Sequence, residues 1–300
     1  MRAAARSREV LFLNQRYLII NADDYGMAEN TNTAIEALFD AGAITSATIL
    51  SPAALAREAC ETAAARGYAV GVHWTLCAEW ADVPWPPCAG KDAASLADEA
   101  GSLYQDSAQM AKHAKSAEVD KELMAQYHFM CSHGCPPDHA DSHRGSLYGL
   151  DKRAFFVNAF RLCRRYHLPF RFPKSPVFLQ RLGVSVPGLP ALHRGIVLLG
   201  SAMKVSLLDD LIFHSPPEAE NRDALLAYYR KELAGAPAGI SELFMHPALY
   251  SESTAARNPA WAQKCQWEYE LLQSGAIVDA ARQEGFTLVS WKEAPFARSE

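Results

Sequence analysis

The 300-residue sequence has no hydrophobic run long enough to cross a membrane, and it carries little excess charge of either sign. A membrane-spanning helix needs about 20 consecutive apolar residues, and no segment of the sequence approaches that length. The 29 Lys and Arg residues against 34 Asp and Glu give a net charge of −5. No basic field is therefore available to neutralise nucleic-acid phosphates. We expect neither a membrane span nor a nucleic-acid partner.

Cysteine is also too sparse to staple the fold. The seven cysteines are an odd number scattered over a long chain, whereas disulfide scaffolds are short and dense in cysteine. The apolar stretch after the first arginines is broken at Asn14, so it lacks the apolar core of a secretory signal. We expect reduced thiols and a cytoplasmic protein, with residues 1–16 as an N-terminal extension and residues 17–300 as one folded domain.

What the sequence does contain is an alternation of strand-like and helix-like segments. An apolar run at 17–22 precedes a helical pattern at 30–41, and strand patterns recur at 43–50, 68–76 and, less regularly, around 207–213. Strands alternating with helices predict a parallel sheet. We count seven or eight strands without a linker or a fixed repeat. The predicted fold is α/β, a single distorted (β/α) barrel with parallel strands.

One segment interrupts this alternation. Residues 77–113 are rich in Pro, Ala and Trp, and they show neither a helical nor a strand period. Loops of this length within a compact domain are often functional. We therefore predict an insertion near residues 77–113 of the barrel.

Unusual polar residues stand at the ends of the predicted strands. These residues are Asp23, Asp24, His73, Asp141, His143 and His246. In a (β/α) barrel the carboxyl ends of the strands converge on one mouth, where active sites form. Side chains far apart in the sequence are therefore expected to meet.

These residue types suit metal-assisted hydrolysis. One carboxylate and two imidazoles can hold Zn²⁺ or another divalent ion and leave positions open for water and substrate. A second carboxylate could act as general base, and a further histidine could protonate a leaving nitrogen. Successive side chains on an extended strand point in opposite directions. Asp23 and Asp24 are therefore predicted to face different groups.

Simpler explanations exist for each residue alone. An Asp-Asp pair after a strand is often a solvated turn, His73 could be a hydrogen-bonded core residue, and His246 could belong to a turn. The His and Cys residues between 128 and 143 offer a structural zinc site as a rival, but no second cysteine pair follows them. Trp74, Trp80 and Trp85 could stack on a sugar or pack a loop.

Several motifs together carry a resemblance to a known family. The segments are LIINADDYGMAENTNTAI (18–35), ITSATILSP (44–52), GVHWTL (71–76), HADSHRGSLYG (139–149) and ELFMHPA (242–248). In this order and context they resemble the YdjC-like carbohydrate deacetylases, also called the ChbG/HpnK family. The resemblance runs from residue 18 to residue 294, nearly the whole chain.

The resemblance implies a distorted (β/α) barrel and a hydrolase that removes an acetyl group from an N-acetylated sugar with a divalent metal ion. By position in the motifs, Asp24, His73 and His143 are implied as metal ligands. Asp23 is implied as the base that activates water, and His246 as the acid or an oxyanion stabiliser. Zn²⁺ and Mg²⁺ both remain possible by ligand type. Family members are often dimers, so a homodimer is possible.

The segment after His143 departs from many members of the family. They carry further histidines there, whereas this chain has Arg144-Gly145-Ser146, which leaves room for a different substrate. Arg144 and Trp74 are predicted substrate contacts, although Arg144 could instead pair with a neighbouring carboxylate. Two other functions stay open: a metallohydrolase acting on another amide or ester, and a non-catalytic sugar-binding barrel.

Overall fold

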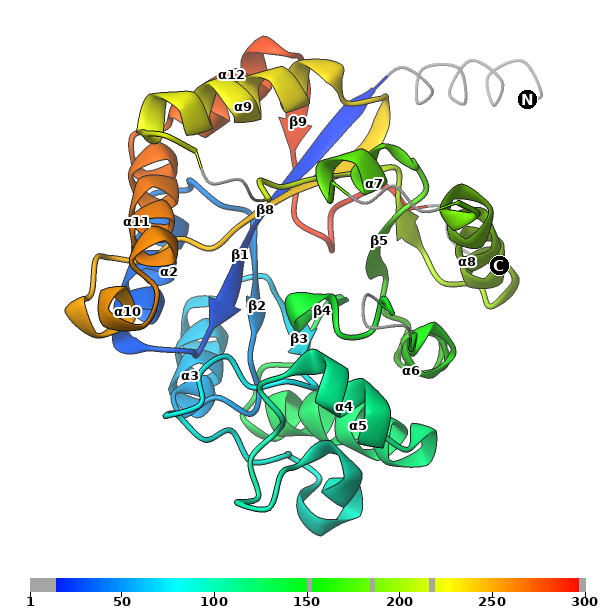
Figure 1. The fold of residues 1–300 in the computed structure, drawn as a ribbon. Helices are drawn as coiled ribbons and strands as arrows, with labels where there is room; N and C mark the ends of the chain where they lie inside the picture. Colours follow the sequence, from blue (N-terminus) through cyan, green and yellow to red (C-terminus); the bar gives the residue numbers. More distant parts are fainter. Residues whose placement is uncertain (1–14, 150–152, 184–186, 216–218, 297–300) are drawn as a thin grey trace.

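The computed structural model describes residues 15–149, 153–183, 187–215 and 219–296, and in these residues one parallel sheet forms the centre of the molecule (Figure 1). Its strands follow the order β6-β5-β4-β3-β2-β1-β8-β7, and β9 pairs with the first part of β1. The bounds are β1 (Arg16–Tyr25), β2 (Ser46–Ile49), β3 (Val70–Trp74), β4 (Ala140–Ser142), β5 (Phe170–Pro173), β6 (Leu207–Leu208), β7 (Asp210–Ile212), β8 (Gly239–Met245) and β9 (Phe286–Leu288).

A short segment closes this sheet into a barrel. Strands β6 and β7 stand at opposite ends of the strand order, yet only Asp209 separates them in the chain. β6 pairs with β5, while β7 pairs with β8. The segment therefore bridges the two ends of the sheet and leaves few unpaired strand edges. The predicted single, distorted (β/α) barrel is confirmed.

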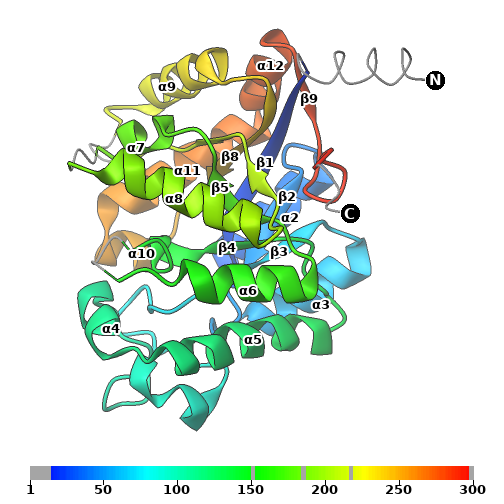
Figure 2. The same ribbon diagram turned by 90° about the vertical axis from the view of Figure 1, so that its right-hand side faces the viewer.

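Helices surround the strands on the outside of the barrel, and α6 and α8 run across the face of β4 and β5 in Figure 2. Their bounds are α2 (Glu29–Asp40), α3 (Ala56–Arg66), α5 (Ser116–Ser132), α6 (Phe156–Tyr166), α7 (Val177–Arg181), α8 (Leu189–Ala202), α9 (Arg222–Gly235), α10 (Glu252–Arg257), α11 (Pro259–Gln273) and α12 (Ala276–Gln283). Residues 18–25 of β1 are buried throughout, as expected for a parallel strand covered on both faces.

Some element boundaries differ from the sequence prediction. Asp23 and Asp24 belong to β1 instead of a following loop. Ser51-Pro52, a capping residue followed by proline, predicts a helix start, but α3 begins only at Ala56. The sequence pattern over residues 260–284 predicts mostly helix, but the structure divides this stretch at Gly275, whose φ of 78° is left-handed. A glycine adopts that conformation without steric cost, so it can end one helix and begin the next.

The predicted insertion is present and packs along α5. It contains a 3₁₀ helix, η1 (Gly90–Leu96), and α4 (Ser107–His113). The fully buried carboxylate of Glu122 in α5 accepts hydrogen bonds from the backbone N–H groups of Cys88 (2.9 Å) and Ala89 (2.8 Å). Glu118 accepts another from the N–H of Ser95 at 2.7 Å. The insertion is therefore fastened to α5 through its backbone.

Two further predictions concern the chain as a whole. The N-terminal extension at residues 1–16 lies outside the described residues except for its last two, so it stays a prediction. Across the described parts of the chain, every helix is too short or too polar to cross a membrane.

Candidate active site

The polar residues expected at the strand ends do converge at the mouth of the barrel. Asp23 and Asp24 come from β1, His73 from β3, and His143 directly follows β4. These four residues are at most 3% exposed. His246 follows β8 and is more open, with 20% of its side chain exposed. Elements distant in the sequence thus build one compact polar cluster.

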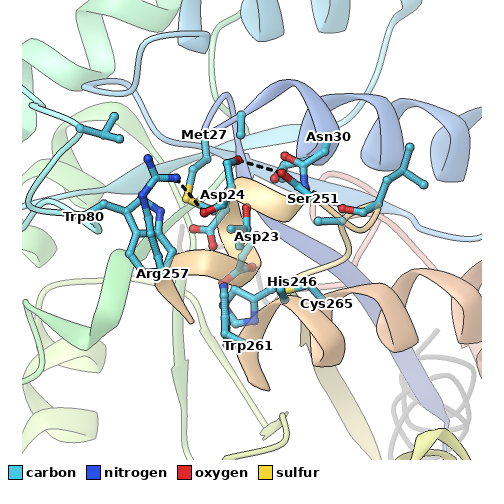
Figure 3. A pocket seen from close by; sticks show the side chains of 18 of the residues that line it. Asp23, Asp24, Met27, Asn30, Trp80, His246, Ser251, Arg257, Trp261 and Cys265 are labelled. Carbon is cyan, nitrogen blue, oxygen red and sulfur yellow. Dashed lines mark hydrogen bonds and ion pairs between the residues drawn. The ribbon is translucent and has the colours of Figure 1, made fainter. Parts of the chain in front are cut away.

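The two adjacent aspartates line the same cavity but contact different groups, because Asp24 faces His73 and His143 whereas Asp23 faces Arg171. Pairing between β1 and β2 shifts register between Ala22 and Tyr25, and Asp24 has a left-handed φ of 71°. This β-bulge breaks the alternation of side chains along the strand. Aspartate tolerates the left-handed region better than most residues. Both carboxylates therefore point toward one space, as Figure 3 shows.

Three side-chain atoms converge closely enough to share a metal ion. Asp24 Oδ1 lies 3.4 Å from His73 Nε2 and 3.3 Å from His143 Nδ1, and the two ring nitrogens are 3.3 Å apart. Two ligand atoms of a tetrahedral Zn²⁺ are about 3.4 Å apart, because each is roughly 2.1 Å from the ion. The spacing of this triad fits a divalent ion.

In each imidazole, the nitrogen that points away from Asp24 faces another carboxylate. Asp141 Oδ1 is 2.6 Å from His73 Nδ1, and Glu79 Oε2 is 3.2 Å from His143 Nε2. A carboxylate favours a proton on the nitrogen that it faces, so with an ion beside Asp24 the lone pair of the other nitrogen would be free to bind it. The arrangement would suit both rings to metal coordination.

The electrostatics of the triad favour cations. Burial alone would raise the pKa of Asp24, but interactions with the His143 and His73 rings hold that pKa well below its usual range. Burial would lower the pKa of His73, but Asp141 and Asp24 raise it to about 10. Burial likewise opposes charge on His143, and Asp24 and Glu79 raise its pKa. Carboxylates that stabilise protonated rings would also attract a divalent ion.

A buried arginine organises the second layer of the site. Arg171 of β5 donates to both oxygens of Asp23 at 2.7 Å, to Glu242 at 2.8 and 3.0 Å, and lies 2.7 Å from Asp141 Oδ2. Burial would lower the pKa of Arg171, but the three carboxylates raise it well above its usual value. Arg171 and His73 in turn oppose the effect of burial on Asp141 and lower its pKa to about 2. This network fixes the position of the Asp23 carboxylate.

His246 also faces the Asp23 carboxylate. Its Nε2 lies 3.9 Å from Asp23 Oδ2, and its ring packs edge-on against Trp261 at 4.7 Å. The backbone N–H of His246 donates to Glu268 at 2.6 Å. Burial would raise the pKa of Glu268, but the charges of Lys264 and His246 lower it. An ionised Glu268 therefore anchors the loop that carries His246.

Two cavities meet at Asp23, His246 and Trp261. The smaller, about 80 Å³, is drawn in Figure 3, where Trp80 and Arg257 stand on one side of the aspartates. The larger, about 450 Å³, also reaches His73 and Arg171, and it has an apolar wall formed by Tyr148, Phe178, Leu211, Phe213 and Phe244. The shared boundary puts the polar cluster where substrate can reach it.

The two predicted substrate contacts have different outcomes. Trp74 is fully buried, its indole N–H donates to the carbonyl of Leu123 at 3.0 Å, and it packs against Phe170. It lines neither cavity, because its side chain points out of the barrel toward α5, so the prediction of a substrate contact is wrong. Arg144 does line the larger cavity, and its substrate role stays a prediction.

The alternative zinc site between residues 128 and 143 does not form. His128 contacts the hydroxyl of Tyr166 at 3.2 Å, and His139 bonds to Asp138 and stacks on Trp291. Within the described ranges, the side-chain groups that could hold a metal are both at the mouth: Asp24, His73 and His143, and Asp23, His73 and Asp141. The second set is occupied by Arg171, which leaves the first as the better site.

Sequence reasoning missed three of the charged residues around the site. Glu79 lies within the insertion, where no periodic pattern indicates which way its side chain points. Arg171 lies in β5 and Glu242 in β8, and both are buried. A charged residue within a buried strand is almost always paired, so the sequence could have indicated that Arg171 and Glu242 have charged partners.

The protein is a nearly closed barrel of parallel strands surrounded by helices, with a carboxylate and imidazole cluster at the carboxyl ends of the strands, where (β/α) barrels carry their active sites. A model of the YdjC-like protein family matches residues 17–283. The chain belongs to this family.

Three relatives illustrate the similarity. A carbohydrate deacetylase of Thermus thermophilus is 30% identical over 235 residues, which cover 78% of each chain. A carbohydrate deacetylase of Enterococcus faecalis is 35% identical over 161 residues, 53% of this chain and 59% of the relative. A solved structure from Enterococcus faecalis, named for cellobiose-phosphate cleavage, has a TM-score of 0.74 at 26% identity. It covers 93% of this chain and 98% of its own.

Proposed function

We propose that this protein is a metal-dependent hydrolase that removes the acetyl group from an N-acetylated sugar. The observation that carries the proposal is the convergence of Asp24, His73 and His143 beside a second carboxylate, Asp23, and a further imidazole, His246. The names of the two carbohydrate deacetylases support the choice of a sugar amide as substrate.

Asp24, His73 and His143 would hold the divalent ion, Zn²⁺ or Mg²⁺. Such an ion supplies a Lewis acid that polarises a carbonyl and lowers the pKa of water toward neutrality. The chain's own contribution is to present one oxygen and two nitrogens at 3.3–3.4 Å from one another. Asp141 and Glu79 keep the two rings turned toward the ion.

Asp23 is proposed as the general base that takes a proton from the attacking water. Its carboxylate borders both cavities, and Arg171 holds it through two hydrogen bonds of 2.7 Å. Asn21 Nδ2 adds a further hydrogen bond at 2.8 Å. A fixed carboxylate needs little reorganisation when the proton is transferred.

His246 is proposed as the acid that protonates the leaving nitrogen. Its Nε2 faces Asp23 Oδ2, and both groups border the cavities where the amide would lie. A proton on Nε2 would be available beside Asp23, at the wall shared by the two cavities. The base and the acid would thus act on the two ends of the bond that breaks.

The cavities suit a ligand with both polar and apolar faces. Aromatic side chains such as Trp80, Trp85 and Trp261 line the smaller cavity beside polar groups of Asn30 and Arg257. Such surfaces pack against the C–H face of a sugar while the polar groups hydrogen-bond its hydroxyls. The sugar would lie along the wall that the two cavities share, where Asp23, His246 and Trp261 border both.

The proposal is tested by measuring acetate release from N-acetylglucosamine and its oligomers with the zinc- and magnesium-loaded protein. Release of acetate, with the free amino sugar as the second product, is expected. A panel of other acyl amides and esters separates this activity from that of a different metallohydrolase. A metal-loaded protein that binds these sugars but never releases acetate would instead be a sugar-binding barrel.

A further inference from the structure

We propose that Glu79 is a positioning residue that selects the metal-binding form of His143 and thereby couples the insertion to the metal site. The proposal rests on the proposed metal site but not on the identity of the sugar. It assigns a role to the insertion, which carries Glu79 near its first residues.

The contact between the two side chains is direct and largely sheltered. Glu79 Oε2 lies 3.2 Å from His143 Nε2, and the side chains are 20% and 4% exposed. The opposite ring nitrogen, Nδ1, is the one that approaches Asp24 and His73. Glu79 therefore stands behind the ring, on the side away from the proposed ion.

Glu79 acts through His143 and not on the substrate. Among the described residues that line the two cavities, Glu79 is absent, whereas Asp23 and His246 belong to both. With an ion beside Asp24, a carboxylate facing Nε2 would keep the ring proton there, leave the Nδ1 lone pair free for the ion, and make that nitrogen more basic. Without the carboxylate, a neutral ring could carry its proton on Nδ1, where it would block the ion.

Arg144, the residue after His143, holds the insertion next to His143 by hydrogen bonds. Arg144 has a left-handed φ of 52°, and its guanidinium donates to the carbonyls of Ala78 (3.0 Å) and Gln105 (2.9 Å). These acceptors lie near the two ends of the insertion. The ring of Trp85 is also 5.6 Å from that of His143. Contacts from three parts of the insertion thus meet at one metal ligand and its neighbour.

The proposal is tested by the affinity for Zn²⁺, measured by competition with a chromophoric chelator. Glu79→Ala is expected to weaken zinc binding by about 10- to 100-fold, as is typical when a group that orients a ligand is removed. Glu79→Gln is expected to weaken it less, because the amide oxygen can still accept the Nε2 proton. Asp82→Asn is the matched control: it removes a carboxylate of the same insertion that pairs with Arg257 and is 62% exposed. It should leave zinc affinity unchanged.

A spectroscopic readout separates positioning from general support of the insertion. In ¹⁵N-histidine NMR spectra of the zinc-loaded protein, His143 should carry its proton on Nε2, and Glu79→Ala should lose that protected signal. Zinc affinity equal to wild type in both Glu79 variants would overturn the proposal. If Glu79→Ala fails to fold, Glu79→Leu, which also lacks a proton acceptor, replaces it in both measurements. Zinc affinity is independent of acetate release, so a wild-type protein that binds zinc but releases no acetate refutes only the proposed function.

Discussion

At the scale of single residues, the two adjacent aspartates should separate metal binding from turnover. Asp24→Asn should lose most of its zinc affinity, because the side chain is the only carboxylate in the triad. Asp23→Asn should keep the metal but lose about 10²- to 10⁴-fold in the rate of acetate release, since it removes the base and not a ligand. Metal content and acetate release measured on both variants check this. Loss of metal in Asp23→Asn, or retained turnover, would contradict the assignment.

Replacing the buried Arg171 should lower the free energy of unfolding by more than the loss of an exposed ion pair would. Arg171→Met would leave Asp23, Asp141 and Glu242 buried without their shared partner, and breaking a buried ion pair costs about 3–5 kcal/mol. Urea unfolding of the protein measures the loss. The control is Arg222→Met, whose pair with Glu270 is about half exposed and should be worth roughly 0–1 kcal/mol. Equal losses for the two variants would show that Arg171 does not hold the network together.

At the scale of elements, the bulge in β1 is the feature that the sequence predicted least well. The NADD segment predicted a strand followed by two polar residues, and simple alternation predicted that they would face apart. The left-handed φ of Asp24 and the register shift against β2 instead direct the Asp23 and Asp24 carboxylates toward one cavity. Such a bulge depends on pairing with a distant strand, so local periodicity does not reveal it. By contrast, the strand ends that carry His73, His143 and His246 were predictable from local pattern.

The attachment of the insertion to α5 gives an element-scale prediction. Glu122→Ala removes the acceptor for two backbone N–H groups, at Cys88 and Ala89, and leaving buried donors unsatisfied costs about 1–3 kcal/mol each. Amide hydrogen exchange in residues 84–97 should therefore accelerate. Lys121→Ala is the control, since it removes only an exposed pair between α5 and Asp92 of η1. Equal exchange in both variants would mean that the buried carboxylate does not fasten the insertion.

At the scale of the whole molecule, the barrel was predictable because its longer strands alternate with helices, although its closure was not. One strand was expected around residues 207–213, whereas two short strands separated by Asp209 pair with opposite ends of the sheet. Strands of two and three residues leave almost no periodic signal. The ion-pair network around Arg171 could not be predicted from local sequence pattern either. Arg171 and its three carboxylate partners come from four strands and meet only when the barrel forms.

The central claim is that the barrel mouth binds one divalent ion and uses it to hydrolyse an N-acetyl sugar. The most direct measurement is acetate release from N-acetylglucosamine oligomers by chelator-treated protein during titration with Zn²⁺ or Mg²⁺. We predict negligible release without metal and a rise that saturates at one ion per chain, with Asp24→Asn failing to respond. Full release by the chelator-treated protein, or release unaffected by Asp24→Asn, would contradict the account.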